Sequence, residues 1–314
     1  MLIKVMAKLR KDTKKVSNST RAVGAEPEAA FNWFPGHMMK ALREVKARVD
    51  KVDLVLEIRD ARLPLASGNS LLREAVGGKS RLTLLNKANL SDPEVNKAWE
   101  EWFTANKEEF LFINCLDRAS LKEVIAKAKT IIENKRKQSG GDNIADKDKY
   151  KFMIVGLPNT GKSTFINSVA NRNAAKVANK PGQTQVQQWI NVDDQVDLLD
   201  TPGIMPARIE EEVHKTWMSI INAIPDHVVS DDEGACYLVN SFLKRKNPEF
   251  KDRYKFDSLD MGLEEALTHI AKVRGCLKHK GLPDLDRVYK LILIDFREGL
   301  LGRISLETPP RIHS

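Results

Sequence analysis

The stretch GLPNTGKS at residues 156–163 decides the fold of this chain. It has the spacing G-x-x-x-x-G-K-[ST], and it stands between a short apolar run at residues 151–155 and a helix-like sequence at residues 164–170. A strand, a glycine-rich turn and a helix in this order are the context of a phosphate-binding loop. The glycines let backbone N–H groups curl around an anion, and the helix N-terminus adds partial positive charge. We therefore expect Lys162 to reach the β- and γ-phosphates of a nucleotide and the Ser163 hydroxyl to bind Mg²⁺.

The composition limits the class of protein. The chain has 314 residues, of which 42% are hydrophobic, and this is enough for one large core and a smaller one. The three cysteines are isolated and give neither metal-site spacing nor a disulfide framework, so a reducing compartment is expected. No apolar run is long enough to form a transmembrane segment. The net charge of +8 favours a polyanionic partner, RNA or DNA, over a surface that is merely rich in lysine.

Residues 1–30 form a basic leader. Before residue 25 its lysines and arginines are opposed only by Asp12, and an apolar stripe runs from Leu2 to Leu9. A basic amphipathic start that is poor in acidic residues is typical of an organelle transit peptide. The alternative is a disordered basic arm that touches RNA. We favour the transit peptide.

Alternating strands and helices over residues 31–206 predict an α/β domain with a mostly parallel sheet covered on both faces. Ligands of such sheets bind at the carboxyl ends of the strands. Residues 134–150 are charged and lack periodicity, so they are predicted to be a linker. Beyond residue 206 the strand pattern is lost, and the apolar spacing predicts a small all-helical domain over residues 207–314. Its basic residues are either solvated helix faces or contacts to RNA.

Two further residues follow the phosphate loop in the order that a nucleotide switch requires. Asp200 opens the sequence DTPG directly after an apolar run, where a second group that orders Mg²⁺ belongs. Thr184 ends the sequence KPGQT and is placed to close on the γ-phosphate and the metal when GTP is bound. Each alone would be an ordinary loop residue, whereas their joint order after the loop favours the switch.

Asn86-Lys87 together with Asn89 resembles the guanine-recognition motif N-K-x-D of GTPases, yet it precedes the phosphate loop instead of following it. This inverted order, with FPGHM at residues 34–38 ahead of it and LLGRISLE at residues 300–307 near the end, resembles the circularly permuted GTPases that act in ribosome assembly. The resemblance covers residues 31–308, and with the basic leader it is greatest to the mitochondrial members of the family.

The resemblance implies a circularly permuted P-loop GTPase domain at residues 31–206, followed by a helical C-terminal domain at residues 207–314. It implies an enzyme that hydrolyses GTP to GDP slowly on its own, is stimulated by the ribosome, and acts as a switch in assembly of the large ribosomal subunit by binding rRNA. Mg²⁺ and K⁺ are the implied cofactors. The implied location is the mitochondrial matrix, with peripheral association with the inner membrane.

The resemblance also assigns site residues. The nucleotide-binding set carried over is Asn86, Lys87, Asn89, Cys115, Asn159, Thr160, Gly161, Lys162, Ser163, Thr164, Thr184 and Gly203. The implied magnesium ligands are Ser163, Thr184 and Asp200.

One departure from ordinary GTPases concerns the catalytic group. Ile204 follows Gly203, where Ras-like enzymes place the glutamine that orients water. The remedy proposed for the family is a catalytic histidine in the FPGHM motif, which is His37 here, and the alternative role of His37 is to cap the aromatic turn. Asn159 matches an asparagine that helps to hold K⁺ in related GTPases, and it is alternatively only a turn residue.

A second departure concerns the base. Position 89 is asparagine, and an amide offers one acceptor and one donor where the family's aspartate accepts two hydrogen bonds from guanine. The mismatch is worth about 1–3 kcal/mol. Cys115 stands where the family commonly has an alanine that presents its backbone to the guanine oxygen. The two departures predict either that the preference for guanine is relaxed or that Asp92 contributes after a register shift of the motif. The alternative function is a nucleotide-binding RNA scaffold without turnover, but retention of Lys162 and Asp200 favours the enzyme.

Overall fold

The computed structural model describes residues 36–138, 149–170, 188–206, 209, 211–225 and 228–311. These residues belong to one compact unit that begins at Trp33. The predicted leader, most of the predicted linker and Thr184 lie outside the described residues.

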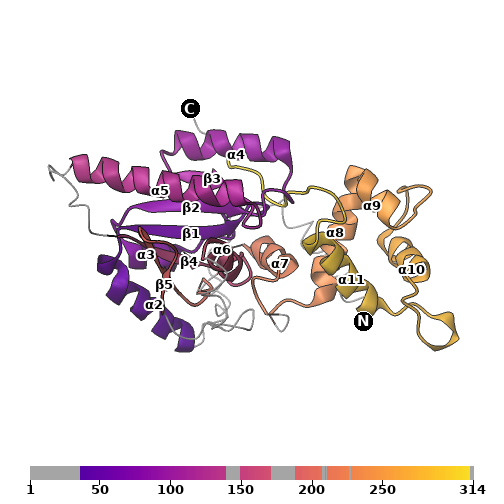
Figure 1. Ribbon diagram of the computed structural model, residues 1–314. Coiled ribbons are helices and arrows are strands. Elements are labelled where there is room, and N and C mark those ends of the chain that lie inside the picture. Colours follow the sequence, from indigo (N-terminus) through magenta and orange to yellow (C-terminus); the bar gives the residue numbers. More distant parts are fainter. Residues whose placement is uncertain are drawn as a thin grey trace, which may run out of the picture. The chain divides into compact units, whose positions relative to one another are not determined.

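Six strands form one sheet in the order β3-β2-β1-β4-β6-β5 (Figure 1). Their bounds are Leu54–Asp60 (β1), Arg81–Asn86 (β2), Phe110–Phe112 (β3), Tyr150–Gly156 (β4), Gln188–Asn191 (β5) and Val196–Asp200 (β6). All neighbouring pairs are parallel except β5 and β6, which are antiparallel. The mostly parallel sheet predicted from the sequence is therefore confirmed. The strand order reverses between β1 and β4, and the carboxyl ends at such a reversal are where α/β sheets bind ligands.

Helices cover both faces of the sheet. They are α2 (Gly36–Arg48) with the short η1 (Val49–Lys51), α3 (Ser70–Val76), α4 (Pro93–Ala105), α5 (Arg118–Gln138) and α6 (Lys162–Val169). Because successive strand residues point to opposite faces, Leu56 and Ile154 pack with α5 and α6, whereas Val55 and Met153 pack with α2 and α3. Trp99 of α4 is fully buried in a further aromatic cluster beside the sheet.

Beyond β6 the described residues form helices and one isolated bridge, between Leu277 and Pro283. The helices are α7 (Glu212–Ile220), α8 (Asp231–Arg245), α9 (Pro248–Arg253), α10 (Leu263–Val273), η3 (His279–Gly281) and α11 (Leu285–Arg297). Their core is apolar and includes the fully buried Phe250 and Ile292. The same cluster contains Leu63 and Leu157 from the sheet region, and the domain boundary at residue 206 stays a prediction.

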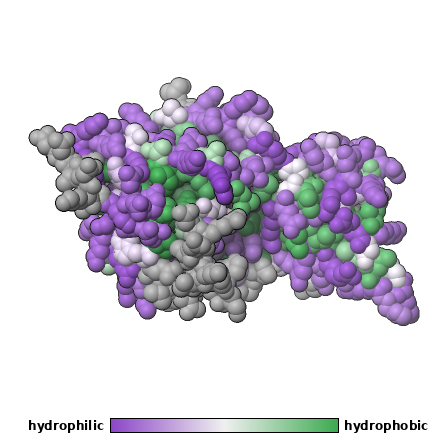
Figure 2. Space-filling view, in the orientation of Figure 1, coloured by the Kyte–Doolittle hydropathy of each residue, from purple (hydrophilic) through white to green (hydrophobic). Residues whose placement is uncertain are grey.

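The surface seen in Figure 2 is mostly hydrophilic, and apolar areas lie both over the α/β part and among the C-terminal helices. No helix in the described part of the chain is both long and apolar enough to cross a membrane.

Candidate nucleotide site

The phosphate-loop sequence forms a tight connection between β4 and α6. Gly156 has φ +152°, and a Cβ there would lie 2.3 Å from the Ile58 carbonyl oxygen of β1. Gly161 has φ +108°, precedes the first turn of α6, and would place a Cβ 2.1 Å from Asn86 Nδ2. The two glycines therefore bring the loop closer to β1 and β2 than any side chain would permit.

Asn86 is the last residue of β2 and is only 3% exposed. Its Nδ2 donates to the Thr160 carbonyl oxygen at 2.8 Å, and its Oδ1 accepts from the Cys115 backbone N–H at 3.0 Å. One buried amide thus joins the ends of β2 and β3 to the phosphate loop, although these segments are far apart in the sequence. Asn86, Cys115 and Thr160, all singled out from the sequence, lie together at the carboxyl edge of the sheet.

Lys87 makes the second link between the base-motif sequence and the phosphate loop. Its backbone is left-handed, with φ +63°, and its Nζ donates to the Asn159 carbonyl oxygen and to Asp60 Oδ2, each at 3.0 Å. Burial alone would raise the pKa of Asp60, but the cations of Arg62 and Lys87 outweigh it and hold that pKa well below its usual range. Asp60 and Arg62 were not predicted from the sequence to have a role. The feature that could have marked them is a pair of charged residues at the end of a buried apolar strand.

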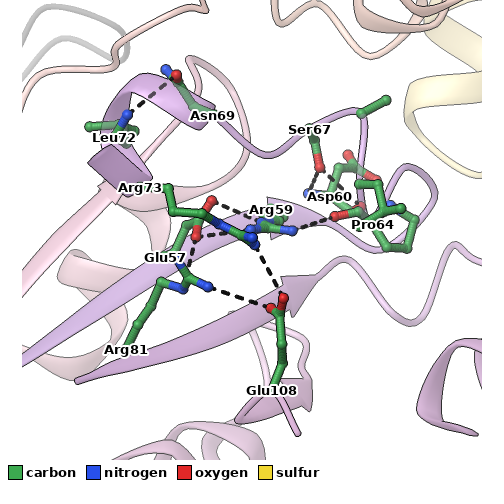
Figure 3. A network of polar contacts seen from close by, with 12 residues as sticks. Glu57, Arg59, Asp60, Pro64, Ser67, Asn69, Leu72, Arg73, Arg81 and Glu108 are labelled. Atoms are coloured by element: carbon green, nitrogen blue, oxygen red, sulfur yellow. Dashed lines mark hydrogen bonds and ion pairs between the residues drawn. The ribbon is translucent and has the colours of Figure 1, made fainter. Parts of the chain in front are cut away.

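A buried network of charged side chains from β1 and β2 supports the turn that follows β1 (Figure 3). Glu57 accepts two hydrogen bonds from Arg59, each at 2.9 Å, and also faces Arg81 at 3.4 Å. Arg59 in turn donates to the Pro64 carbonyl oxygen at 3.0 Å. The buried charges of this network are paired with one another, and their contacts fix the backbone from which the Asp60 side chain projects.

Lys162 lies at the bottom of the loop and is only 8% exposed. Its Nζ donates to the carbonyl oxygens of Gly156 and Leu157 at 3.1 and 2.7 Å. Burial lowers its pKa to about 8, and the nearby Asp200 carboxylate opposes that shift only in part. The charge of the buried ammonium group is therefore only partly compensated by Asp200, and an anionic ligand would stabilise the charged form.

The DTPG sequence runs past the same ammonium group. Asp200 ends β6 and is 5% exposed, and a Cβ at Gly203 would lie 3.2 Å from Lys162 Nζ. Ser163 is exposed in the first turn of α6. A hydroxyl and a carboxylate beside a buried ammonium group match the oxygen ligands and the phosphate environment of Mg²⁺, so these residues fit a magnesium–nucleotide complex.

The remaining predicted residues fall into two groups. Asn89 and Thr164 are exposed, and Asn159 has a left-handed backbone with φ +58° and donates its side-chain N–H to the Asn222 carbonyl oxygen at 2.6 Å. Thr184 lies outside the described residues, and so does the side chain of His37, whose backbone lies in the first turn of α2.

Ile204 is fully buried and points into the core that α2 and α3 share with the sheet. Its N–H donates to the Gly156 carbonyl oxygen at 3.3 Å, and its carbonyl oxygen accepts from Asn69 Nδ2 at 2.8 Å. Ile204 therefore supports the loop from behind, and its side chain has no polar atom with which to orient water.

The chain is similar in sequence and in structure to known GTPases. A family model described as 50S ribosome-binding GTPase matches residues 151–260. Ribosome biogenesis GTPase A of Bacillus cereus is 37% identical over 280 residues, which are 89% of this chain and 94% of the relative. Mitochondrial ribosome-associated GTPase 1 of Mus musculus is 32% identical over 295 residues, 88% of this chain and 89% of the relative. A crystal structure of GNP-bound YlqF from T. maritima is similar with a TM-score of 0.56 and 27% identity, over 87% of this chain and 100% of that one.

Proposed function

The chain belongs to the ribosome biogenesis GTPases, and we propose that it hydrolyses GTP to GDP and phosphate as a molecular switch in assembly of the large ribosomal subunit. One observation carries the proposal: Asn86 donates to the Thr160 carbonyl oxygen at 2.8 Å, so the base motif and the phosphate loop share one edge of the sheet. The inverted order of the two motifs along the chain is therefore compatible with one nucleotide pocket.

The residues of the site have separable tasks in this proposal. The backbone N–H groups of the loop and the Lys162 ammonium group bind the phosphates, while Ser163 and Asp200 would hold Mg²⁺ together with Thr184. The metal, when bound, neutralises negative charge that develops on the phosphates. Asn86 accepts from the backbone N–H of Cys115 and so fixes this segment beside the base motif, and Lys87 is fixed by the Asp60 carboxylate.

His37 is the proposed group that orients or deprotonates the attacking water, since Ile204 has no polar side-chain atom. The proposal is supported by the packing of its neighbour, because Met38 is 5% exposed and belongs to the same core cluster as Leu157 of the phosphate loop. If the large subunit stimulates His37→Ala as strongly as the wild type, the catalytic role of His37 is refuted.

Asn159 is the proposed ligand of a K⁺ ion that replaces the charge of an arginine finger. Its N–H is already directed at the Asn222 carbonyl oxygen, and its Oδ1 is a carbonyl oxygen of the kind that binds K⁺. Replacing K⁺ by Na⁺ should then slow hydrolysis in the wild type but not in Asn159→Ala.

The proposed partner is rRNA of the large subunit. Several basic residues beyond residue 206 make internal contacts, and they are Lys246, Arg253, Arg297 and Arg303. Others are exposed, and they are Lys244, Arg245, Lys255, Arg274 and Lys280. Neutralising two exposed lysines should reduce the salt dependence of RNA binding, because each phosphate contact contributes to that slope.

We further propose a mitochondrial matrix location, which the basic leader and the mitochondrial relatives support. Peripheral association with the inner membrane is part of the same proposal. A fluorescent fusion that carries residues 1–30 should enter mitochondria, and one in which the basic residues of the leader are replaced by glutamine should not.

Single-turnover hydrolysis of GTP with and without large subunits tests the function as a whole. We expect a basal rate on the order of 10⁻⁴ s⁻¹ and stimulation by the subunit, for which about 10⁵-fold is the known upper scale. Lys162→Ala should abolish turnover, and Lys97→Ala, which replaces an exposed lysine of α4, is the control. GTP binding without turnover under both conditions would instead indicate the nucleotide-binding scaffold.

A further inference from the structure

The segment at residues 299–307, which we call the strap, lies along the loop that carries the base motif. Three consecutive contacts go to carbonyl oxygens of this loop. Arg303 donates from Nη2 to Ala88 at 3.0 Å and from Nε to Ser91 at 2.9 Å, and the Ile304 N–H donates to Leu90 at 2.9 Å. The guanidinium group thus spans the loop with two hydrogen bonds.

Two further contacts extend the match between strap and loop. The Asp92 N–H donates to Ser305 Oγ at 3.1 Å. Gly299 has φ +77°, and a Cβ there would lie 2.6 Å from Leu90 Cδ2. The strap therefore follows the loop closely from Ala88 to Asp92, across more than 200 residues of intervening sequence.

The far end of the strap is anchored beside the loop that follows β1. The N–H groups of Leu306 and Glu307 donate to the Arg62 carbonyl oxygen at 3.1 and 3.3 Å. The Glu307 carboxylate accepts from the N–H groups of Leu65 and Ala66 at 2.8 and 3.1 Å. The strap consequently joins the loop after β1, which directly follows Asp60, to the loop after β2, which begins with Lys87.

The position of Asn89 depends on these contacts. Asn89 is exposed in the turn closed by the hydrogen bond from the Leu90 N–H to the Lys87 carbonyl oxygen at 2.8 Å. On the inner side the loop is held by the Ala88 N–H, which donates to Ile113 at 3.0 Å. On the outer side it is held by the strap.

We propose that the strap positions the base-recognition loop, and that Arg303 is a positioning residue for nucleotide selectivity. This inference rests on the proposed function, because it requires that the loop contacts a nucleotide base. Arg303 acts through carbonyl oxygens of the loop, so its loss should weaken recognition of the base and leave recognition of the phosphates unchanged.

The test measures binding of GDP, ADP and inorganic pyrophosphate to the full chain by calorimetry. Arg303→Ala should weaken GDP binding about tenfold, the effect of losing roughly one hydrogen bond, while pyrophosphate affinity stays within about twofold. Arg303→Lys should fall between Arg303→Ala and the wild type, because lysine keeps the charge but lacks the fork. Arg287→Ala, an exposed arginine of α11, is the matched control and should bind all three as the wild type does.

The outcomes separate the two proposals. Wild type that binds neither GDP nor pyrophosphate refutes the proposed function, and this inference fails with it. Wild-type binding combined with an unchanged GDP affinity in Arg303→Ala, or with equal losses for GDP and pyrophosphate, refutes the positioning role alone. If Arg303→Ala does not fold, Ser305→Ala decides by the same comparison, because it removes only the hydroxyl that accepts from Asp92.

Discussion

Replacing Gly161 by alanine tests the close approach on which the pocket depends. The residue has φ +108°, and the new Cβ would lie 2.1 Å from Asn86 Nδ2, far inside van der Waals contact. The side chain of Asn86 must then move, because the backbone of the phosphate loop is fixed on the other side by Gly156 against Ile58. Both hydrogen bonds of the Asn86 amide, to Thr160 and from Cys115, are lost together.

The magnitude follows from these two effects. A non-glycine residue in this backbone region costs on the order of 1–3 kcal/mol. Each buried polar group that loses its partner costs about 1–3 kcal/mol more. Even the lower limits of one strain and two lost partners sum to roughly 3 kcal/mol, which corresponds to more than 100-fold in affinity if it falls on the bound state. The share that falls on folding lowers the melting temperature by roughly 2–4 °C for each kcal/mol.

Calorimetric titration with GDP and a thermal melt together measure both shares. Gly78→Ala is the matched control, because a Cβ at Gly78 meets no atom within 4 Å and its φ is not left-handed. The control should keep wild-type affinity and melting temperature. Wild-type GDP affinity in Gly161→Ala would refute the contact between the loop and Asn86, and with it the geometric argument for a shared pocket.

Three further predictions follow from single residues. The pKa of Lys162 is lowered to about 8, so a bound triphosphate should restore the proton of its ammonium group. The affinity for the triphosphate should therefore fall as pH rises above 8, and the binding heat measured by calorimetry should depend on the buffer because binding takes up a proton. A binding heat that is the same in all buffers would contradict this. Asn89→Asp should raise the preference for GTP over XTP by about tenfold, because a carboxylate accepts both guanine donors, and competition binding measures it. Burial raises the pKa of Glu307 to about 7 despite two backbone donors. The folded state therefore binds this proton more tightly than the unfolded state, and the free energy of unfolding should fall by roughly 3 kcal/mol as pH rises from 4.5 through 7. Urea unfolding at a series of pH values measures this, and Glu307→Gln should lack the fall.

The sheet could be predicted because its strands are apolar runs of ordinary length. The run predicted at residues 151–155 became β4, Tyr150–Gly156, and its residues Phe152 to Val155 are almost completely buried. The glycine spacing placed the phosphate loop, since few other backbones require glycine at both positions. Local pattern therefore suffices where burial and backbone conformation are decided by neighbouring residues.

Contacts between distant segments could not be predicted in the same way. The sequence places Glu57 inside a buried strand but does not say that its carboxylate pairs with Arg59 and with Arg81. It presents Arg303 as one of many basic residues, whereas the structure uses it to hold Ser91. Such roles depend on which carbonyl oxygen or carboxylate the fold brings near, and no local periodicity records that.

The sheet order explains why the inverted motif order leaves the pocket intact. Strands β1 to β3 carry the base-reading loops and β4 to β6 carry the phosphate loops, so each task occupies one contiguous half on its own side of the reversal. The halves are joined by close contacts, Gly156 against Ile58 and Asn86 against Thr160, which depend on packing and not on chain order. The chain leaves the phosphate half after Ile204, and after the C-terminal helices it returns to the base half through the strap. The C-terminal helices are therefore connected to both halves, to the phosphate half through the segment after Ile204 and to the base half through the strap.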